Sequence, residues 1–207
     1  MFITFEGIEG SGKSLQARLL VDRLRAYGQS ALHAHEPGGT PLGDQLRELV
    51  LLRAELQPVA RAEALLMCTS RAQLVETVIR PALQRGDVVV CDRFADSTLV
   101  YQGAGRGLDM NALRTVISFA TAGLTPEMTM LLDLPVEAGL ARKLAQTGAA
   151  WNRFESEAVA FHEQVRAGYR RLAGEEPGRW RCFDGQQSPE QLSDEIWRCV
   201  ATELRLS

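Results

Sequence analysis

The feature that most constrains this chain is a glycine-rich stretch near its start, Gly7-Ile8-Glu9-Gly10-Ser11-Gly12-Lys13-Ser14. It fits the pattern Gly-x-x-x-x-Gly-Lys-Ser/Thr at every fixed position. An apolar run over residues 1–5 precedes it and predicts a buried strand, and leucines at helical spacing follow it. A chance glycine turn is the alternative, but both flanks match a phosphate-binding loop, in which backbone N–H groups and a helix N-terminus face the phosphates. Lys13 would then contact the β- and γ-phosphates, and the Ser14 hydroxyl would ligate Mg²⁺.

Composition limits the class of protein. The chain has 207 residues, enough for one domain, with 45% apolar and 24% charged residues. Its net charge of −3 gives no support for a nucleic-acid-binding surface. No apolar run is long enough to span a membrane, and the N-terminus lacks the pattern of a signal peptide. The four cysteines form no Cys-x-x-Cys pair, which favours reduced thiols in the core of a cytoplasmic protein.

The chain alternates between predicted strands and helices. Strands are expected near residues 1–5, 30–35, 87–91, 129–132 and 180–183. Helices are expected after Gly12, after a Thr40 cap, over 59–84, after Asp109, over 136–173 and after Ser188. This order predicts an α/β fold: a single three-layer domain over residues 1–207, with a five-stranded parallel sheet and helices on both faces. Ligands of such sheets bind at the carboxyl ends of the strands, where the loops at Gly7, Glu36 and Asp92 emerge.

The pair Asp92-Arg93 ends the predicted strand over residues 87–91. A carboxylate there suits Mg²⁺, and the planar guanidinium of Arg93 suits a phosphate, although a surface ion pair at the strand end is the alternative. The two asparagines, Asn111 and Asn152, are not followed by lysine, so the Asn-Lys-x-Asp guanine reader of a GTPase is absent. The chain is also short for a motor ATPase, and a small-molecule kinase fits best.

Four blocks of sequence now resemble the bacterial thymidylate kinases. They are the loop Gly7 to Ser14; Glu36-Pro37-Gly38-Gly39-Thr40-Pro41-Leu42-Gly43 with Arg47; Arg71-Ala72-Gln73 ahead of Val78-Ile79-Arg80-Pro81-Ala82-Leu83; and Asp92-Arg93-Phe94 through Ser97, Tyr101-Gln102-Gly103 and Arg106-Gly107. The resemblance implies a P-loop nucleoside monophosphate kinase fold with a short helical lid at about 142–155. It also implies transfer of a phosphoryl group from ATP to dTMP with Mg²⁺, and a homodimer.

The resemblance also implies roles for individual residues. Glu9 would receive the sugar 3′-hydroxyl, Tyr101 would lie against the deoxyribose, and Arg47 and Arg93 would hold the acceptor phosphate. The rest of the acceptor pocket would comprise Glu36, Pro37, Met67, Arg71, Ser97, Thr98 and Gln102, with Arg71 at the pyrimidine edge. Arg142 would bind the donor, and Arg153 would be the catalytic lid arginine. Without the resemblance, a helical arginine such as Arg47 is most often a solvated surface residue, and Tyr101 could be a core residue with a satisfied hydroxyl.

The chemistry of the acceptor agrees with these roles. A nucleoside monophosphate is already anionic at neutral pH and needs no general base, so positive charge is what the site must supply. Lys13, Arg47, Arg93, Arg153 and Mg²⁺ would supply it. The chain departs from the family pattern at His35, Met67 and Asn152, and its early lid keeps only Arg142 and Lys143. Two alternatives stay open: a deoxynucleoside kinase with Glu9 or Glu36 as base, and a nucleotide-binding protein without turnover.

Overall fold

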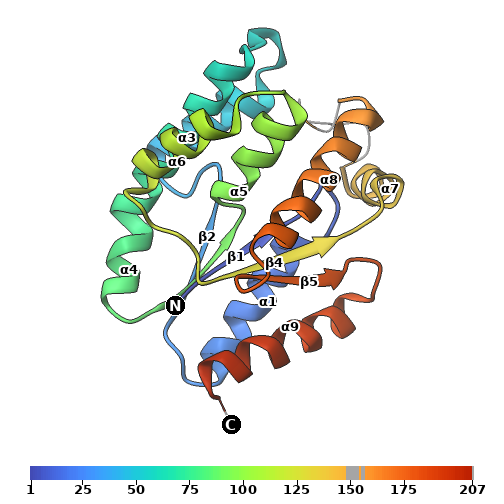
Figure 1. The fold of residues 1–207 in the computed structure, drawn as a ribbon. Coiled ribbons are helices and arrows are strands. Elements are labelled where there is room, and N and C mark those ends of the chain that lie inside the picture. The colour runs from blue at the N-terminus through green and yellow to red at the C-terminus, as the bar shows by residue number, and fades with distance from the viewer. Residues whose placement is uncertain (148–153, 155–156, 207) are drawn as a thin grey trace.

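A computed structural model describes residues 1–147, 154 and 157–206, and shows a central sheet between two layers of helices (Figure 1). The strands are β1 (Phe2–Glu6), β2 (Ala31–His35), β3 (Val88–Asp92), β4 (Met128–Asp133) and β5 (Trp180–Asp184). They pair in parallel in the order β2-β3-β1-β4-β5. The predicted five-stranded parallel sheet is therefore confirmed.

Helices α1 (Lys13–Ala26) and α9 (Pro189–Leu204) pack together on one face of the sheet (Figure 1). The other described helices are α2 (Pro41–Arg47), α3 (Ala60–Leu74), α4 (Arg80–Gln84), α5 (Ala95–Thr98), α6 (Met110–Thr121), α7 (Val136–Thr147) and α8 (Val159–Glu175), with short π- or 3₁₀-helical segments η1 (Glu48–Leu52), η2 (Ala54–Leu56), η3 (Val75–Ile79) and η4 (Leu99–Gly105). Of these, α4 and α8 pack on strands of the sheet, and α3 and α6 pack side by side.

The three central strands, β1, β3 and β4, are almost entirely buried on both faces, which explains why they read as continuous apolar runs. Along β1, Ile3 and Phe5 point into the cluster formed with α1 and α9, whereas Phe2 points into the opposite cluster with Val89 of β3. All are at most 1% exposed. Burial of each such side chain stabilises the fold by roughly 1.5–3 kcal/mol.

Helix boundaries agree with the local capping signals. Thr40, Asp109 and Ser188 each accept a hydrogen bond from the first turn of the helix that follows, and Ser188 forms the predicted capping box with Gln191. The expected helical stretch over 136–173 is two helices, α7 and α8. The segment between them includes most of the expected lid, and residues 148–153 and 155–156 lie outside the described part of the chain.

One expectation about burial is corrected. Cys182, expected in the core, is exposed on the edge strand β5.

Candidate active site

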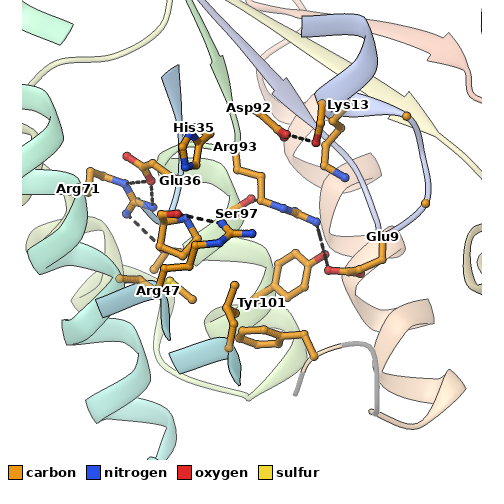
Figure 2. A pocket seen from close by; sticks show the side chains of 18 of the residues that line it. Glu9, Lys13, His35, Glu36, Arg47, Arg71, Asp92, Arg93, Ser97 and Tyr101 are labelled. Atoms are coloured by element: carbon orange, nitrogen blue, oxygen red, sulfur yellow. Dashed lines mark hydrogen bonds and ion pairs between the residues drawn. The ribbon is translucent and has the colours of Figure 1, made fainter. Parts of the chain in front are cut away.

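A cavity of about 710 Å³ opens at the carboxyl ends of the strands (Figure 2). Its lining brings together most of the side chains that the sequence analysis singled out: Glu9, Gly10, Gly12, Lys13, Ser14, Glu36, Pro37, Arg47, Met67, Arg71, Asp92, Arg93, Ser97, Thr98, Tyr101 and Gln102. These residues come from the glycine loop and the start of α1, the end of β3, the loops after β2 and β3, and the helices α2, α3, α5 and η4. Sequence segments that are far apart thus converge on one chamber.

The glycine loop between β1 and α1 owes its shape to residues without side chains. Gly10 has φ +72°, and a Cβ there would lie 2.1 Å from the carbonyl oxygen of Gly139. Gly12 has φ +94° and is the N-cap of α1, so the first N–H groups of the helix face the cavity mouth. The loop therefore has the backbone geometry of a phosphate cradle.

Lys13, at the start of α1, is folded back on this loop. Its Nζ donates hydrogen bonds to the carbonyl oxygen of Ile8 at 2.6 Å and to Oγ of Ser11 at 3.2 Å. Burial lowers the pKa of Lys13 to about 8, with the positive charge of Arg93 acting in the same direction. The ammonium group is thus a desolvated cation whose two acceptors are uncharged oxygens, and phosphate oxygens could replace them.

Ser14 and Asp92 meet across the loop. The Ser14 hydroxyl donates a short hydrogen bond to Oδ2 of Asp92 at the end of β3. The other carboxylate oxygen, Oδ1, is buried and has no hydrogen-bond partner in the described part of the chain. A hydroxyl oxygen beside an unpartnered carboxylate oxygen is a donor set that fits Mg²⁺.

Arg93 makes four side-chain hydrogen bonds in the cavity. Its Nη1 donates to Oγ of Ser97 at 3.2 Å and to the hydroxyl of Tyr169 at 3.1 Å. Its Nη2 donates to Oε1 of Glu9 at 3.1 Å and to the hydroxyl of Tyr101 at 3.0 Å. The backbone of Arg93 has φ +68°, an uncommon conformation for a side chain of this size. Such conformations persist where the surroundings fix them, and they gather at functional sites.

Glu9, within the glycine loop, forms an ion pair with Arg93. Its Oε1 also accepts a hydrogen bond of 2.6 Å from Tyr101, and its Oε2 faces Nδ1 of His162 at 3.5 Å. Burial opposes ionisation, but His162 and the positive charges of Arg93 and Lys13 outweigh it and hold the pKa of Glu9 well below its usual range. Glu9 is therefore an ionised acceptor at neutral pH.

A second buried pair lies at the far end of the cavity. Nε of Arg71 donates to Oε2 of Glu36 at 2.8 Å, and Arg71 also donates to Oγ1 of Thr98 at 3.1 Å. Both charged side chains are at most 4% exposed, and burial raises the pKa of Glu36 while Arg71 opposes that shift. Arg47 lies nearby and donates from Nη1 to the carbonyl oxygen of Pro37 at 2.9 Å. This end of the chamber presents fixed donors to a ligand.

Two of the expected site residues are not placed in the cavity. Arg142 of α7 points to the loop after β5, where its Nη1 donates to the carbonyl oxygen of Gly185 at 2.7 Å. Arg153 lies outside the described residues. Gly7, Ile8 and Ser11 belong to the glycine loop but contribute to its backbone rather than to the cavity lining.

The sequence analysis missed two residues of α8. His162 contacts Glu9, and Tyr169 contacts Arg93 and also donates to Oε2 of Glu6 at 2.8 Å. Both are at most 1% exposed. They lie seven residues apart, two helical turns, on the same face as Phe161, Val165 and Leu172. Two polar residues on an otherwise apolar helix face were the only indication in the sequence that this helix contributes to the site.

A parallel sheet of this strand order, with a glycine loop after its first strand and Lys13 and Arg93 facing one chamber, defines a P-loop kinase. A family model described as thymidylate kinase matches residues 5–196. The chain belongs to the thymidylate kinase family, whose reaction is the ATP-dependent phosphorylation of dTMP, and the predicted family is thereby confirmed.

Individual relatives agree over almost the whole chain. Thymidylate kinase of Thermomicrobium roseum is 50% identical over 204 residues, covering 99% of this chain and 96% of that protein. Thymidylate kinase of Desulfovibrio desulfuricans is 51% identical over 210 residues, covering 99% and 97%. The crystal structure of thymidylate kinase from Ehrlichia chaffeensis superposes with a TM-score of 0.78 at 28% identity, covering 97% of this chain and 98% of that one. No described helix is long and apolar enough to cross a membrane.

Proposed function

We propose that this chain transfers the γ-phosphoryl group of ATP to dTMP, giving ADP and dTDP for dTTP synthesis, with the residues of the cavity in the roles below. The observation that carries the proposal is the placement of two cations in one chamber, the buried Lys13 from the glycine loop and the partly buried Arg93 from the end of β3. Two phosphate groups repel each other, and cations on both sides of their meeting point offset that repulsion.

The donor side is the glycine loop. The N–H groups of Gly7 to Ser14 would hold the triphosphate, and Lys13 would leave Ile8 to reach the β- and γ-phosphates. Mg²⁺ would be held by Ser14 and Asp92, whose unpartnered Oδ1 supports this assignment, and it would neutralise charge on the transferred group. Arg142, beside Gly185, would contact the donor outside the main cavity.

The acceptor side is the far part of the cavity. Arg93 and Arg47 would hold the phosphate of dTMP, and Glu9 would accept the 3′-hydroxyl in place of its present donors. The base would lie among Met67, Arg71, Thr98 and Gln102, with Ser97, Glu36 and Pro37 completing the wall. Because the acceptor phosphate is anionic at neutral pH, none of these groups needs to remove a proton.

Three further assignments belong to this proposal. Arg153 would supply charge from the lid in the transition state. The chain would act in the cytoplasm, where ATP and dTMP are available. It would be a homodimer, supported by exposed apolar side chains on adjacent helices: Leu42 of α2, Leu49 and Leu52 of η1, Leu65 of α3 and Phe119 of α6.

The test is ADP release from ATP with dTMP, thymidine, the other deoxynucleoside monophosphates and UMP as acceptors. We expect turnover with dTMP, none with thymidine, and loss of at least a hundredfold in Lys13→Ala with an unchanged circular dichroism spectrum. Turnover with thymidine instead would indicate a deoxynucleoside kinase with Glu9 or Glu36 as base. ATP binding without any turnover would indicate a binding protein.

A further inference from the structure

A buried carboxylate lies behind Gln102, on the side away from the cavity. Glu63 of α3 is fully buried, and its Oε1 accepts a hydrogen bond of 2.7 Å from Nε2 of Gln102. Nε of Arg106 lies 3.5 Å from the same oxygen, so the carboxylate has a cation beside it as well as the amide. Gln102 itself is only 2% exposed but lines the cavity. The amide of Gln102 therefore sits between a fixed anion and the space proposed for the base.

An ionised carboxylate accepts hydrogen bonds and cannot donate them. The amide nitrogen of Gln102 must therefore face Glu63, because the flipped amide would place two oxygen acceptors against each other in a buried setting without a proton between them. The amide oxygen, Oε1, takes no hydrogen bond from any residue within the described ranges. It is left for a ligand in the cavity.

We propose that Glu63 is a positioning residue that selects the pyrimidine by fixing which way the Gln102 amide points. This inference rests on the proposed function, because it requires the base of the acceptor nucleotide to lie against Gln102. Thymine and uracil carry an N–H donor at N3 beside a carbonyl at C4, whereas cytosine carries an acceptor at N3 beside an amino group. The orientation fixed by Glu63 offers an acceptor to N3–H and keeps one amide N–H for a carbonyl. The flipped amide would match cytosine instead.

The hydrogen-bonding edge of the base and its methyl group are recognised by different residues. Glu63 and Gln102 recognise the hydrogen-bonding edge, which thymine and uracil share, and they do not distinguish a base with the methyl group from one without it. A mismatched hydrogen-bonding group in such a site costs far more in selectivity than a missing methyl group. Rejection of dCMP should therefore depend on Glu63, and the preference for dTMP over dUMP should not.

The test measures dissociation constants of dTMP, dUMP and dCMP by calorimetry, with kcat/KM for each, on the full chain and its Glu63→Gln variant. The substituted amide keeps the volume but can either accept from or donate to Gln102, so both orientations become possible. We expect the selectivity for dTMP over dCMP to fall at least tenfold. The ratio of dTMP to dUMP should stay within about twofold, a result that general loosening of the site would not give.

Two variants serve as controls. Glu157→Gln removes the other carboxylate of Arg106, whose Nη2 lies 2.5 Å from Oε1 of Glu157, without touching Gln102. It should leave both ratios unchanged. In a Gln102→Met background no amide remains to be oriented, so adding Glu63→Gln should have no further effect on the selectivity for dTMP over dCMP. If Glu63→Gln does not fold, Glu63→Met fills the same space without charge and carries the same expectation.

Failure of the role of Glu63 and failure of the proposed function give different results. An unchanged selectivity for dTMP over dCMP in a folded Glu63 variant, including failure of dCMP to bind to either protein, overturns the role of Glu63. So does a parallel loss of dTMP and dUMP binding with no gain in relative dCMP binding. A wild-type chain that neither binds nor phosphorylates dTMP overturns the proposed function itself.

Discussion

At the scale of single residues, the cavity is built from opposite charges that neutralise each other before any ligand arrives. Arg93 pairs with Glu9, and Arg71 pairs with Glu36. Charges buried in this way are costly to leave unpaired, so removal of one partner harms the other as well as itself. Lys13 differs, because its hydrogen bonds in the described structure go to uncharged oxygens.

This difference predicts how ATP binding depends on pH. The pKa of Lys13 is lowered by burial to about 8, so its charge is present at pH 7, half lost at about pH 8 and largely absent above pH 9. Affinity of the free enzyme for ATP should fall as pH rises from 7 to 9.5, by at most about tenfold per unit. Titration of ATP across that range measures it. Lys13→Arg is the control, because a guanidinium stays charged, and a flat wild-type profile would contradict the assignment.

Tyr101 gives a second prediction at this scale. The proposed role of its ring is to fill the space of a ribose 2′-hydroxyl, while its own hydroxyl donates to Glu9. Tyr101→Phe should lower kcat/KM for dTMP by roughly tenfold, since a hydrogen bond to a charged group is lost, but should still reject UMP. Tyr101→Ala should accept UMP and dUMP at similar rates. Rejection of UMP by the alanine variant would show that another residue selects the sugar.

At the scale of elements, α8 is the helix that ties the site together. It lies against the sheet beside β4 and β5 (Figure 1), and its buried face brings His162 to Glu9 and Tyr169 to Arg93. Tyr169 also donates to Glu6, a buried carboxyl at the end of β1. Burial and the negative charge of Asp96 raise the pKa of Glu6 to about 7. One rigid helix thus supports both sides of the central ion pair.

Removal of the Tyr169 hydroxyl should show how much α8 contributes to the stability of the site. Tyr169→Phe keeps the ring but deprives Arg93 of an acceptor and Glu6 of a donor, so we expect the free energy of unfolding to fall by about 1–3 kcal/mol. The Michaelis constant for dTMP should rise several-fold, while that for ATP should change little. Urea unfolding and steady-state kinetics measure both effects. An equal rise in both Michaelis constants would mean that the helix acts through general stability.

The elements differ in how far the sequence predicts them. The sheet was predictable because strands buried on both faces are short apolar runs, and the glycine loop because its pattern is local. His162, Tyr169 and Glu63 were missed because each is an ordinary residue of a helix whose role comes from a partner at least 39 positions away. Local spacing carries no information about such contacts.

At the scale of the whole molecule, the neighbouring helices α2, α3 and α6 have apolar side chains on their outer surface that are exposed to solvent. Phe119 of α6 is 89% exposed and Leu65 of α3 is 55% exposed, although both helices are well packed on their inner sides. Such a surface on a chain of 22.8 kDa favours self-association over a monomeric state.

The expected mass in solution is therefore twice that of one chain. Phe119→Glu should shift the protein toward the monomer in sedimentation or light-scattering experiments, because it places a charge in the apolar contact. Tyr27→Glu, at a half-exposed ring on the opposite layer, is the matched control and should leave the mass unchanged. A monomeric wild-type protein would contradict the homodimer, but not the kinase activity.

The Arg93–Glu9 ion pair also determines which kinds of ligand the cavity can bind. Inorganic phosphate that bound Arg93 would compete with Glu9 for the guanidinium, and weakening this partly buried ion pair is costly. A ligand that carries both an anion and a hydroxyl donor can replace the two halves of the pair at once. The chamber therefore favours ligands that carry both an anion and a hydroxyl donor, and simple anions should compete poorly for it even though the site is rich in positive charge.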